Sequence, residues 1–451
     1  MKKKLLKILL FVTLVSLTVL YTYKVRILVD DELFNYGFAK NIIDGLIPYK
    51  DFNMIIPPLF AYITALVLKV FGQSLLVYHI LTAVIITSIT FMSAKKIGIL
   101  SFIIYSLLLI YPYTGYNMFT LFLFFILLNT IKEESTNKKK KNEEKQNKLT
   151  EYLEPIIISL IILTKHTLGL LVIPSLIYSK NKLKTFLIYV GAFLVLLTYL
   201  LLNNNIMQFI DYTLLGMFDF AEKNGTGIDF LLIVEIAIIG YLIYLTKKTK
   251  KKEYFYILMY QIVTFPIVNY IHFIISFIPF VYIIISKYKN NFYVKWFSGV
   301  ALITFAITFG VLLFRENKYF QPEYYNDNNF MKGRLTQKIT IEGVELIDEY
   351  TSIYKEHKLY IFSYLGYYMK LNLDLPITKY DLINNGNMGY KGYDKYIEET
   401  EEYCKDNKCI FFITKQEANE KGFQTNKKIL KYVMENYRNV YSTNYFNIYV
   451  N

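Results

Sequence analysis

Cysteine is nearly absent from this chain of 451 residues, which contains only Cys404 and Cys409. Two cysteines are too few for a cysteine-ligated metal site or for a scaffold of several disulfides. Their spacing leaves open a short-loop disulfide or two unpaired thiols. Nucleotide-binding fingerprints are missing as well. The glycine-rich stretch NNGNMGYKGY (384–393) matches neither a P-loop nor a dinucleotide motif, and we interpret it as a cluster of turns.

Apolar residues are abundant instead. They make up 54% of the chain, and the mean hydropathy of +0.31 is too high for a soluble protein of this length. The net charge of +14 would suit a nucleic-acid partner in a soluble protein, but the lysines gather in short loops between apolar runs, as in MKKK, KKKK and KKTKKK. That pattern is the positive-inside signal of multi-pass membrane proteins. We therefore expect a plasma-membrane protein embedded in the lipid bilayer, with no nucleic-acid partner.

The apolar runs predict a polytopic α-helical membrane protein with about eleven transmembrane helices, since a helix needs about 20 apolar residues to cross the hydrocarbon. The first run is interpreted as a retained helix, because it is long for a secretory signal and no A-x-A site follows it. The candidate spans are 5–27, 75–94, 97–112, 117–131, 155–165, 167–179, 185–202, 229–246, 253–271, 273–287 and 294–314.

Two ambiguous segments are decided by parity, because lysine-rich loops on one side of a membrane must be separated by an even number of crossings. The apolar piece 57–71 then lies at the surface or re-enters without crossing. The segment 155–179 becomes a tight pair of short helices with its apex at Lys165-His166, since a single crossing would leave Lys165 near mid-membrane at a cost of roughly 2.5–3.5 kcal/mol. The N-terminus is expected in the cytoplasm and everything after about Arg315 outside.

The chain changes character after residue 314, and we predict a transmembrane domain (1–314) followed by a small extracytoplasmic α/β domain (315–451). In the tail, short β-rich runs (KLYIFSYL, CIFFIT, FNIYV) alternate with helical patterns such as NKKILKYVMENY. Within the first domain, the run 132–150 is interpreted as a flexible cytoplasmic loop. Glu151 and Glu154 are expected to be solvated at the cytoplasmic boundary.

Two external loops carry acids. The loop 203–230 is long enough for a surface helix with Asp211 and Asp219. The loop 28–74 opens with Asp30, Asp31 and Glu32 directly after the first apolar run, and an amphipathic pattern follows. Carboxylates facing water at a membrane exit cost little, so a solvated loop is the plain alternative. The amphipathic pattern favours a loop that lies along the membrane and holds its acids at the headgroup boundary.

The stretch DDELFNYGFAKNIIDGLIPYKDFNMIIPPLFAYITALVLKVFG resembles the first external loop of GT-C membrane glycosyltransferases of the protein O-mannosyltransferase and aminoarabinose transferase type. In that family an Asp-Glu pair opens the loop, G-x-x-P-Y-[RK]-D follows, and P-P-L begins a helix that ends in F-G. The stretches LTKHTLGLL (163–171) and HFIISFIPF (272–280) and the external tail add to the resemblance. It implies a GT-C-like fold with juxtamembrane helices and a polyprenyl-phosphate sugar donor.

The resemblance also implies an inverting transfer of a sugar, on the outer face, to a protein, lipid or glycan acceptor. Asp31 matches the catalytic position of the family and is the candidate general base. Glu32 is assigned a supporting role, and Asp30 is an additional acid that the family pattern lacks.

Cations gathered at the leaving phosphate would stabilise the transition state. The candidates are Lys50, Lys165, His166 and His272, although Lys50 could merely snorkel at the interface and His272 could cap a helix end. Asp51 could bind the acceptor or a divalent cation, so a metal requirement stays open. A local ion pair is the plainer role for this aspartate.

Two other functions fit the same architecture: a transporter or flippase for a lipid-linked sugar, and an envelope polysaccharide assembly protein without catalysis. Transporters tend to show related halves with broken helices and charge at the midplane. No internal repeat is evident in this sequence, and the acids gather in one external loop. This distribution favours the enzyme.

Overall fold

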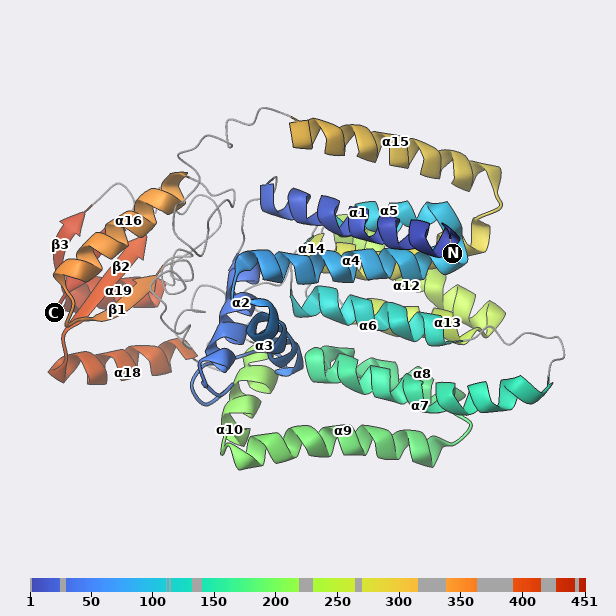
Figure 1. Cartoon of the computed structure of the whole chain (residues 1–451). Helices are drawn as coiled ribbons and strands as arrows, with labels where there is room; N and C mark the ends of the chain where they lie inside the picture. Colours follow the sequence, from blue (N-terminus) through green and yellow to red (C-terminus); the bar gives the residue numbers. More distant parts are fainter. Residues whose placement is uncertain are drawn as a thin grey trace.

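The structure is a computed structural model, and it describes residues 2–24, 30–110, 112, 115–131, 140–218, 230–263, 270–314, 338–362, 392–414, 427–442 and 446–451. These residues are mostly helical, with one small sheet near the C-terminus (Figure 1). The helices up to residue 314 are α1 (Lys2–Lys24), α2 (Asp30–Ile43), α3 (Leu59–Phe71), α4 (Leu75–Ile97), α5 (Ser101–Leu108), α6 (Tyr116–Thr130), α7 (Lys140–Thr164), α8 (Val172–Tyr178), α9 (Lys182–Leu202), α10 (Ile206–Phe209), α12 (Phe230–Thr249), α13 (Lys252–Ile262), α14 (Tyr270–Tyr288) and α15 (Phe292–Phe314). Short helical turns occur at η1 (Gly98–Leu100), η2 (His166–Leu171) and η3 (Ile210–Leu215).

Each predicted span contains helical structure among its described residues, so the mostly helical character of the fold is confirmed. Four helical stretches among the described residues are long and apolar enough to cross a membrane: Lys4–Thr22, Leu75–Leu108, Lys182–Leu202 and Phe230–Thr249. Shorter apolar helices are also present, for example Tyr116–Thr130 and His272–Tyr288. The total of about eleven crossings remains a prediction.

The stretch from Leu75 to Leu108 consists of two helices and is not one continuous helix. α4 and α5 pack side by side, so the chain reverses between them at η1. Gly98 starts this turn with a φ of 60°, a conformation that costs glycine little and other residues more. The sequence predicts separate spans at 75–94 and 97–112, in agreement with this hairpin.

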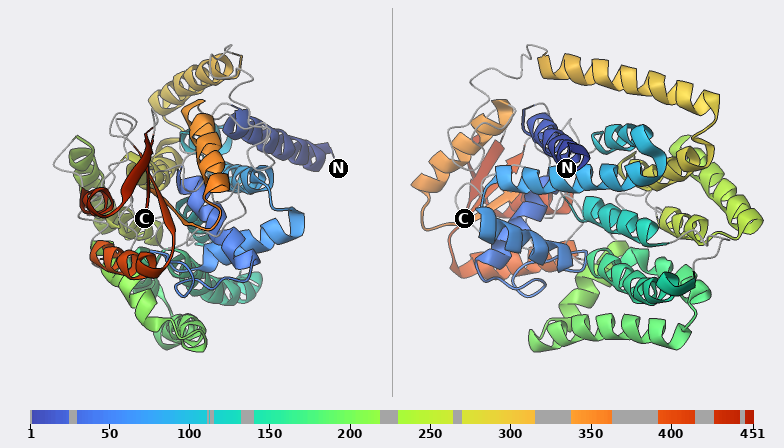
Figure 2. Two further views of the ribbon diagram at one scale, coloured as in Figure 1. Left: turned by 90° about the vertical axis from the view of Figure 1, so that its left-hand side faces the viewer. Right: turned by 45° about the vertical axis from the view of Figure 1, so that its right-hand side comes forward.

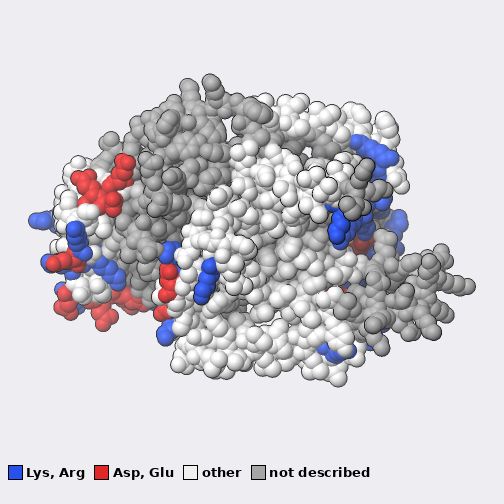
Figure 3. Space-filling view, in the orientation of Figure 1, with Lys and Arg blue, Asp and Glu red and all other residues white. Residues whose placement is uncertain are grey.

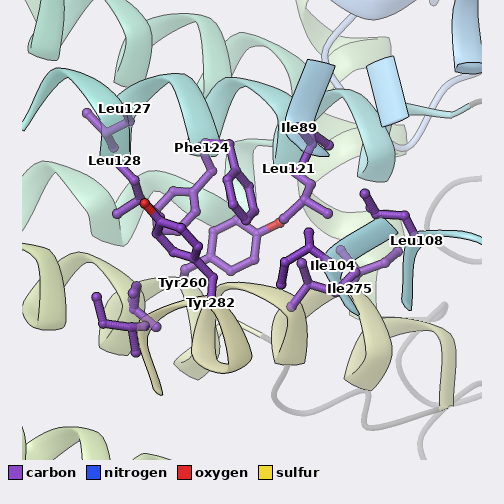
Figure 4. Close-up of a cluster of buried hydrophobic side chains, with 14 of the residues drawn as sticks. Ile89, Ile104, Leu108, Leu121, Phe124, Leu127, Leu128, Tyr260, Ile275 and Tyr282 are labelled. Carbon is purple, nitrogen blue, oxygen red and sulfur yellow. The ribbon is translucent and has the colours of Figure 1, made fainter. Parts of the chain in front are cut away.

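The core of the bundle lies mainly between α4, α5, α6, α7, α13 and α14. Phe124 of α6 stacks on Tyr260 of α13 with 4.3 Å between ring centroids (Figure 4). The ring of Phe125 lies 5.3 Å from that of Tyr282 of α14. Aromatic pairs at such separations add stability beyond the burial of their area. They fix α6, whose first turn contributes to the candidate site, against α13 and α14.

α2 and α3 form a separate layer across one end of the bundle. In Figure 1, α3 is seen nearly end-on while α4, α6 and α9 run across the view, and the turned view of Figure 2 shows α3 along its length. α3 has 13 residues, which corresponds to about 20 Å. This direction and length are those expected of a helix at the surface of a membrane, as the parity of the lysine-rich loops predicts for 57–71.

The C-terminal part combines helices with a four-stranded sheet of order β1-β2-β4-β3. β1 is parallel to β2, whereas β4 is antiparallel to both β2 and β3. The strand runs KLYIF, CIFFIT and FNIYV are confirmed, while β3 and α18 were not predicted. The elements are α16 (Lys338–Ile353), β1 (Lys358–Phe362), α18 (Gly392–Asp406), β2 (Cys409–Thr414), α19 (Lys427–Asn436), β3 (Arg438–Ser442) and β4 (Phe446–Val450).

Cys404 and Cys409 form a disulfide that joins the end of α18 to the start of β2. The structure thus decides between the two alternatives that the sequence leaves open. The sheet also packs against the α2–α3 layer, because Ile410 and Phe412 of β2 belong to the same buried cluster as Leu33 of α2 and Leu68 of α3. A salt bridge of 3.1 Å between Lys395 and Asp211 joins α18 to η3.

Charge is distributed unevenly over the length of the molecule. Figure 3 shows lysines at the end of the bundle far from the C-terminal part, and a broad, almost uncharged band between them and the mixed charges of that part. At the lysine-rich end, Lys96 pairs with Glu253 at 2.8 Å. The distribution is compatible with a membrane protein whose lysine-rich loops share one side.

Two expectations about the lysine-rich end are wrong. Glu154 is buried and not solvated, because its carboxylate pairs with Lys252 and accepts a hydrogen bond from the hydroxyl of Tyr256. α7 begins at Lys140, so residues 140–150 are helical where a flexible loop is predicted. Residues 132–139 of that run lie outside the described residues, as do Asp219 and most of the glycine-rich stretch 384–393.

Candidate functional site

The acidic motif forms the first turn of α2. The structure describes α2 from Asp30 onward, so Asp30, Asp31 and Glu32 occupy its first described turn. The backbone of Asp30 and Asp31 is part of the helix, while their side chains lie outside the described residues. Glu32 is fully buried, and its Oε1 lies 3.6 Å from Nδ1 of His79, which is also fully buried in α4. The sequence does not predict this acid–base pair.

The same side of α2 reaches the first turn of α6. A Cβ on Gly115, the residue before α6, would lie 3.4 Å from Nδ2 of Asn35. The side chain of Asn35 therefore lies beside Gly115, at a distance where a Cβ would make an ordinary van der Waals contact. Asn35 follows Glu32 by three residues and position 31 by four, and residues at these spacings share a helix face. The N-terminus of α6 thus lies beside the acidic turn.

Lys165 contacts this first turn of α6. Its Nζ donates to Oδ1 of Asn117 at 2.8 Å and lies 5.8 Å from the ring centre of Tyr116. Lys165 is in the short break between α7 and η2, as the predicted hairpin apex requires. An ammonium has three donors, and the bond to Asn117 uses one of them. The structure therefore connects Lys165 to the start of α6, which also lies beside Asn35 of α2.

The two candidate histidines lie at the same end of the bundle. The imidazole of His166 contacts the sulfur of Met217, in the helical segment that follows η3. His272 is half-buried at the start of α14. One turn further along α14, Ser276 accepts a hydrogen bond from Gln261, whose amide also donates to both carboxylate oxygens of buried Glu235 at 2.8 Å. This polar group inside the bundle is a second feature that the sequence does not predict.

The segment IPYKDF is a tight turn that is held in place by residues of the segment after α9. Tyr49 has a φ of 70°, and its hydroxyl donates to the carbonyl of Ile56 at 2.6 Å. Burial raises the pKa of this phenol, so it stays a neutral donor. Nδ2 of Asn205 donates to the carbonyl of Pro48, and the hydroxyl of Thr213 donates to the carbonyl of Met54. The backbone of the turn is therefore held in one position.

Lys50 and Asp51 occupy the exposed side of that turn. Oδ2 of Asp51 accepts from the backbone N–H of Ile47 at 2.7 Å. Asp51 thus stabilises its own turn, which is an ordinary role for an aspartate in such a position. Among the residues that the structure describes, no group of three or more His, Cys, Asp or Glu side chains is placed to hold a metal ion.

The sequence analysis did not select two ionisable residues, although the sequence around each of them marks it as a candidate. His79 and Glu235 are ionisable residues inside apolar helices, and such residues are by default functional candidates. Asn117 carries no comparable signal, since asparagine near a helix start is common.

Comparison with known proteins does not assign this chain to a family. No family model matches it, and no curated protein matches it either. The arrangement of the acidic turn, the PYKD turn and Lys165 at one end of the helical bundle is therefore the basis for a functional proposal.

Proposed function

We propose that this protein is an integral-membrane glycosyltransferase that moves a sugar from a polyprenyl-phosphate carrier to an acceptor on the outer face, with Asp31 as general base. The observation that supports the proposal is the path of contacts between α2 and Lys165: Asn35 of α2 lies beside Gly115, and Asn117, two residues further on, accepts the hydrogen bond of Lys165. In the proposal, Asp31 at the start of α2 serves the acceptor and Lys165 serves the donor phosphate.

The reaction assigns these two groups to opposite sides of the sugar. The acceptor oxygen attacks the anomeric carbon, and its proton passes to the carboxylate of Asp31 as the new bond forms. The bond from the anomeric carbon to the phosphate oxygen breaks, and the phosphate leaves with the electron pair. The ammonium of Lys165 stabilises the developing negative charge. The polyprenyl tail stays in the bilayer throughout, which requires a site at headgroup level.

The position of the site relative to the lysine-rich end supports an external active site. In Figure 1, α2 lies at the end of the bundle opposite α13, which begins at Lys252, and Figure 3 shows lysines gathered at that opposite end. If those lysines mark the cytoplasmic side, the acidic turn faces outward. The disulfide between Cys404 and Cys409, in the part that packs on α2 and α3, agrees with an oxidising compartment on this side.

The proposal is tested by deleting the gene and restoring it as wild type, Asp31→Asn or Asp44→Asn. Asp44 is the matched control, because it is an acid of the same loop whose partner is Lys40, at 2.9 Å on the surface. Surface glycans and lipid-linked sugars are compared by mass spectrometry. We expect deletion to remove one surface sugar and to accumulate its lipid-linked donor, Asp31→Asn to reproduce deletion, and Asp44→Asn to restore wild type.

A flippase would also accumulate the lipid-linked sugar, so purified protein is needed to separate the two functions. The protein is placed in detergent with the lipid extract of the deletion strain and with membranes of that strain as acceptor. Transfer of the sugar by wild type, and its loss with Asp31→Asn in folded protein, supports the enzyme. Surface sugars restored by Asp31→Asn would refute the assignment of the base.

A further inference from the structure

Two lysines and three tyrosines gather near the C-terminal ends of α12 and α14, at the lysine-rich end of the bundle. The hydroxyl groups of Tyr241 on α12 and Tyr288 on α14 lie 3.3 Å apart. Nζ of Lys287 lies 4.9 Å from the ring centre of Tyr288 and 5.8 Å from that of Tyr241. On α12, Nζ of Lys248 donates to the hydroxyl of Tyr244 at 2.7 Å, and this ring stacks beside Tyr241. We call these five residues the Lys–Tyr cluster.

The Lys–Tyr cluster lies on the outside of the bundle and not in its core. Tyr244, Tyr288 and both lysines are exposed, and Tyr241 is half-buried. α12 is one of the helices that are long and apolar enough to cross a membrane. The cluster therefore lies at the level at which such a helix leaves the hydrocarbon, where lysine and tyrosine side chains reach the headgroups.

An apolar strip of α12 leads from the cluster toward the other end of the helix. It consists of Ile233, Ile236 and Ile243, which are all exposed. Spacings of three and seven residues put these side chains on one face of a helix, and Tyr244 borders that face. In a helix that spans a bilayer, an exposed apolar face lies against acyl chains. The strip and the cluster thus place an apolar surface next to a cationic end, in the order in which a phospholipid presents its tail and its headgroup.

The two lysines of the cluster are not neutralised by acids of the part of the chain that the structure describes. No carboxylate there forms a salt bridge with Lys248 or Lys287. Other lysines at this end are paired, since Lys96 lies 2.8 Å from the carboxylate of Glu253 at the start of α13. An ammonium has three donors, and the bond to Tyr244 uses one of those of Lys248. The cluster is therefore a cationic site that still has hydrogen-bond donors for an anion.

We propose that the Lys–Tyr cluster binds the phosphate of an anionic phospholipid whose acyl chains lie along the apolar strip of α12. The ammonium groups of Lys248 and Lys287 pair with the phosphate, and the hydroxyl of Tyr288 donates a hydrogen bond to it. Basic pockets between transmembrane helices bind anionic headgroups in this way. A free phosphate would make no use of the apolar strip, so the occupant is a lipid. The inference does not depend on the proposed transferase activity.

The test measures lipid binding to the detergent-purified, full-length protein by native mass spectrometry. Phosphatidylglycerol and phosphatidylcholine with identical acyl chains are titrated separately, because both contain a phosphate and only the first has a net negative charge. We expect wild type to bind phosphatidylglycerol about tenfold more tightly than phosphatidylcholine. Each lysine beside an anionic headgroup contributes about fivefold to binding, so Lys248→Gln with Lys287→Gln should weaken phosphatidylglycerol binding roughly 25-fold.

The matched control is Lys182→Gln with Lys295→Gln, which removes the same charge from exposed lysines in the first turns of α9 and α15. We expect its affinity for phosphatidylglycerol to equal that of wild type. Lys248→Arg with Lys287→Arg keeps both charges and should retain most of the binding. Because the substituted lysines are exposed, all variants are expected to fold, and each single glutamine variant of the cluster should lose about fivefold.

Three results would overturn the proposal. Equal affinity of wild type for the two lipids would show that the cluster makes ordinary interfacial contact with any headgroup. An equal loss in the control variant would show a general attraction of anionic lipid to the lysine-rich end. Displacement of bound phosphatidylglycerol by an equal concentration of inorganic phosphate would identify a soluble anion as the ligand.

Discussion

The side chain of Asn205 holds the PYKD turn in place: its Nδ2 donates to the carbonyl oxygen of Pro48 at 2.8 Å, across 157 positions of the chain. Asn205 is fully buried and lies between α9 and α10. The loop 28–74 and the segment that follows α9 are therefore tied together behind the exposed pair Lys50-Asp51. Phe209 of α10 completes the contact with its ring edge against Tyr49, 5.2 Å between centroids.

Asn205→Leu is expected to destabilise the protein, because it leaves the buried carbonyl of Pro48 without this donor. The cost of such an unsatisfied group is about 1–3 kcal/mol, to be measured as the loss of unfolding free energy in a detergent-solubilised denaturation series. Asn203→Leu is the control, since the amide of Asn203 donates to the carbonyl of Tyr199 in its own helix and is only half-buried. Equal losses for both variants would show that the turn does not depend on Asn205.

Lys165 is expected to contribute to the chemical step and not to the fold. Lys165→Gln keeps a hydrogen-bond donor for Asn117 but removes the charge at the leaving phosphate, and loss of one such stabilising group costs roughly a hundredfold or more in kcat. Lys165→Arg keeps the charge and should retain more activity than the glutamine variant. The measurement is the initial rate of sugar transfer at saturating lipid extract.

Lys69→Gln is the control for that series, because Lys69 is an exposed lysine in the last turn of α3, at the same end of the molecule. We expect its transfer rate to equal that of wild type. A Lys165→Gln variant with normal kcat would remove Lys165 from the proposed phosphate site, while Asp31 could still be the base.

The sequence predicts local features well and pairings between distant helices poorly. Apolar runs place the helices, and the predicted apex at Lys165 is found, because a lysine inside an apolar stretch has few tolerable positions. The partner of Glu32 could not be predicted, since His79 lies on another helix and only the packing of α2 on α4 brings the two within 3.6 Å. The burial of Glu154 has the same cause: Lys252 and Tyr256 reach it from α13.

Glu154 is expected to be a strong contributor to stability at the lysine-rich end. Glu154→Ala leaves Lys252 half-buried without its carboxylate, and breaking a buried ion pair in this way costs about 3–5 kcal/mol. Partial exposure of Lys252 places the effect at the lower end of that range. The measurement is the unfolding free energy in detergent, with sugar transfer by the folded fraction as a second readout that should stay normal.

The control for Glu154→Ala is a surface ion pair in the C-terminal part. There, Nζ of Lys408 lies 2.8 Å from Oε2 of Glu356. Both side chains of this pair are largely exposed, and water screens such a pair so that it contributes little to stability. Glu356→Ala should therefore leave stability nearly unchanged. A loss for Glu154→Ala no larger than that for Glu356→Ala would mean that the buried network is not formed in the membrane.

The disulfide provides a test of the side on which the C-terminal part lies. Cys404 and Cys409 are five positions apart, and closing a loop of that size stabilises a fold by about 2 kcal/mol in the chain-entropy account. They are the only cysteines of the chain, so protein taken from cells under acid quench reports directly on this bond. If the C-terminal part is extracytoplasmic, alkylation without reductant should leave both residues unlabelled, and alkylation after reduction in denaturant should label both. Full labelling of unreduced, denatured protein would place them in a reducing compartment, and the external site proposed for α2 would then lie on the wrong side for a donor in the outer leaflet.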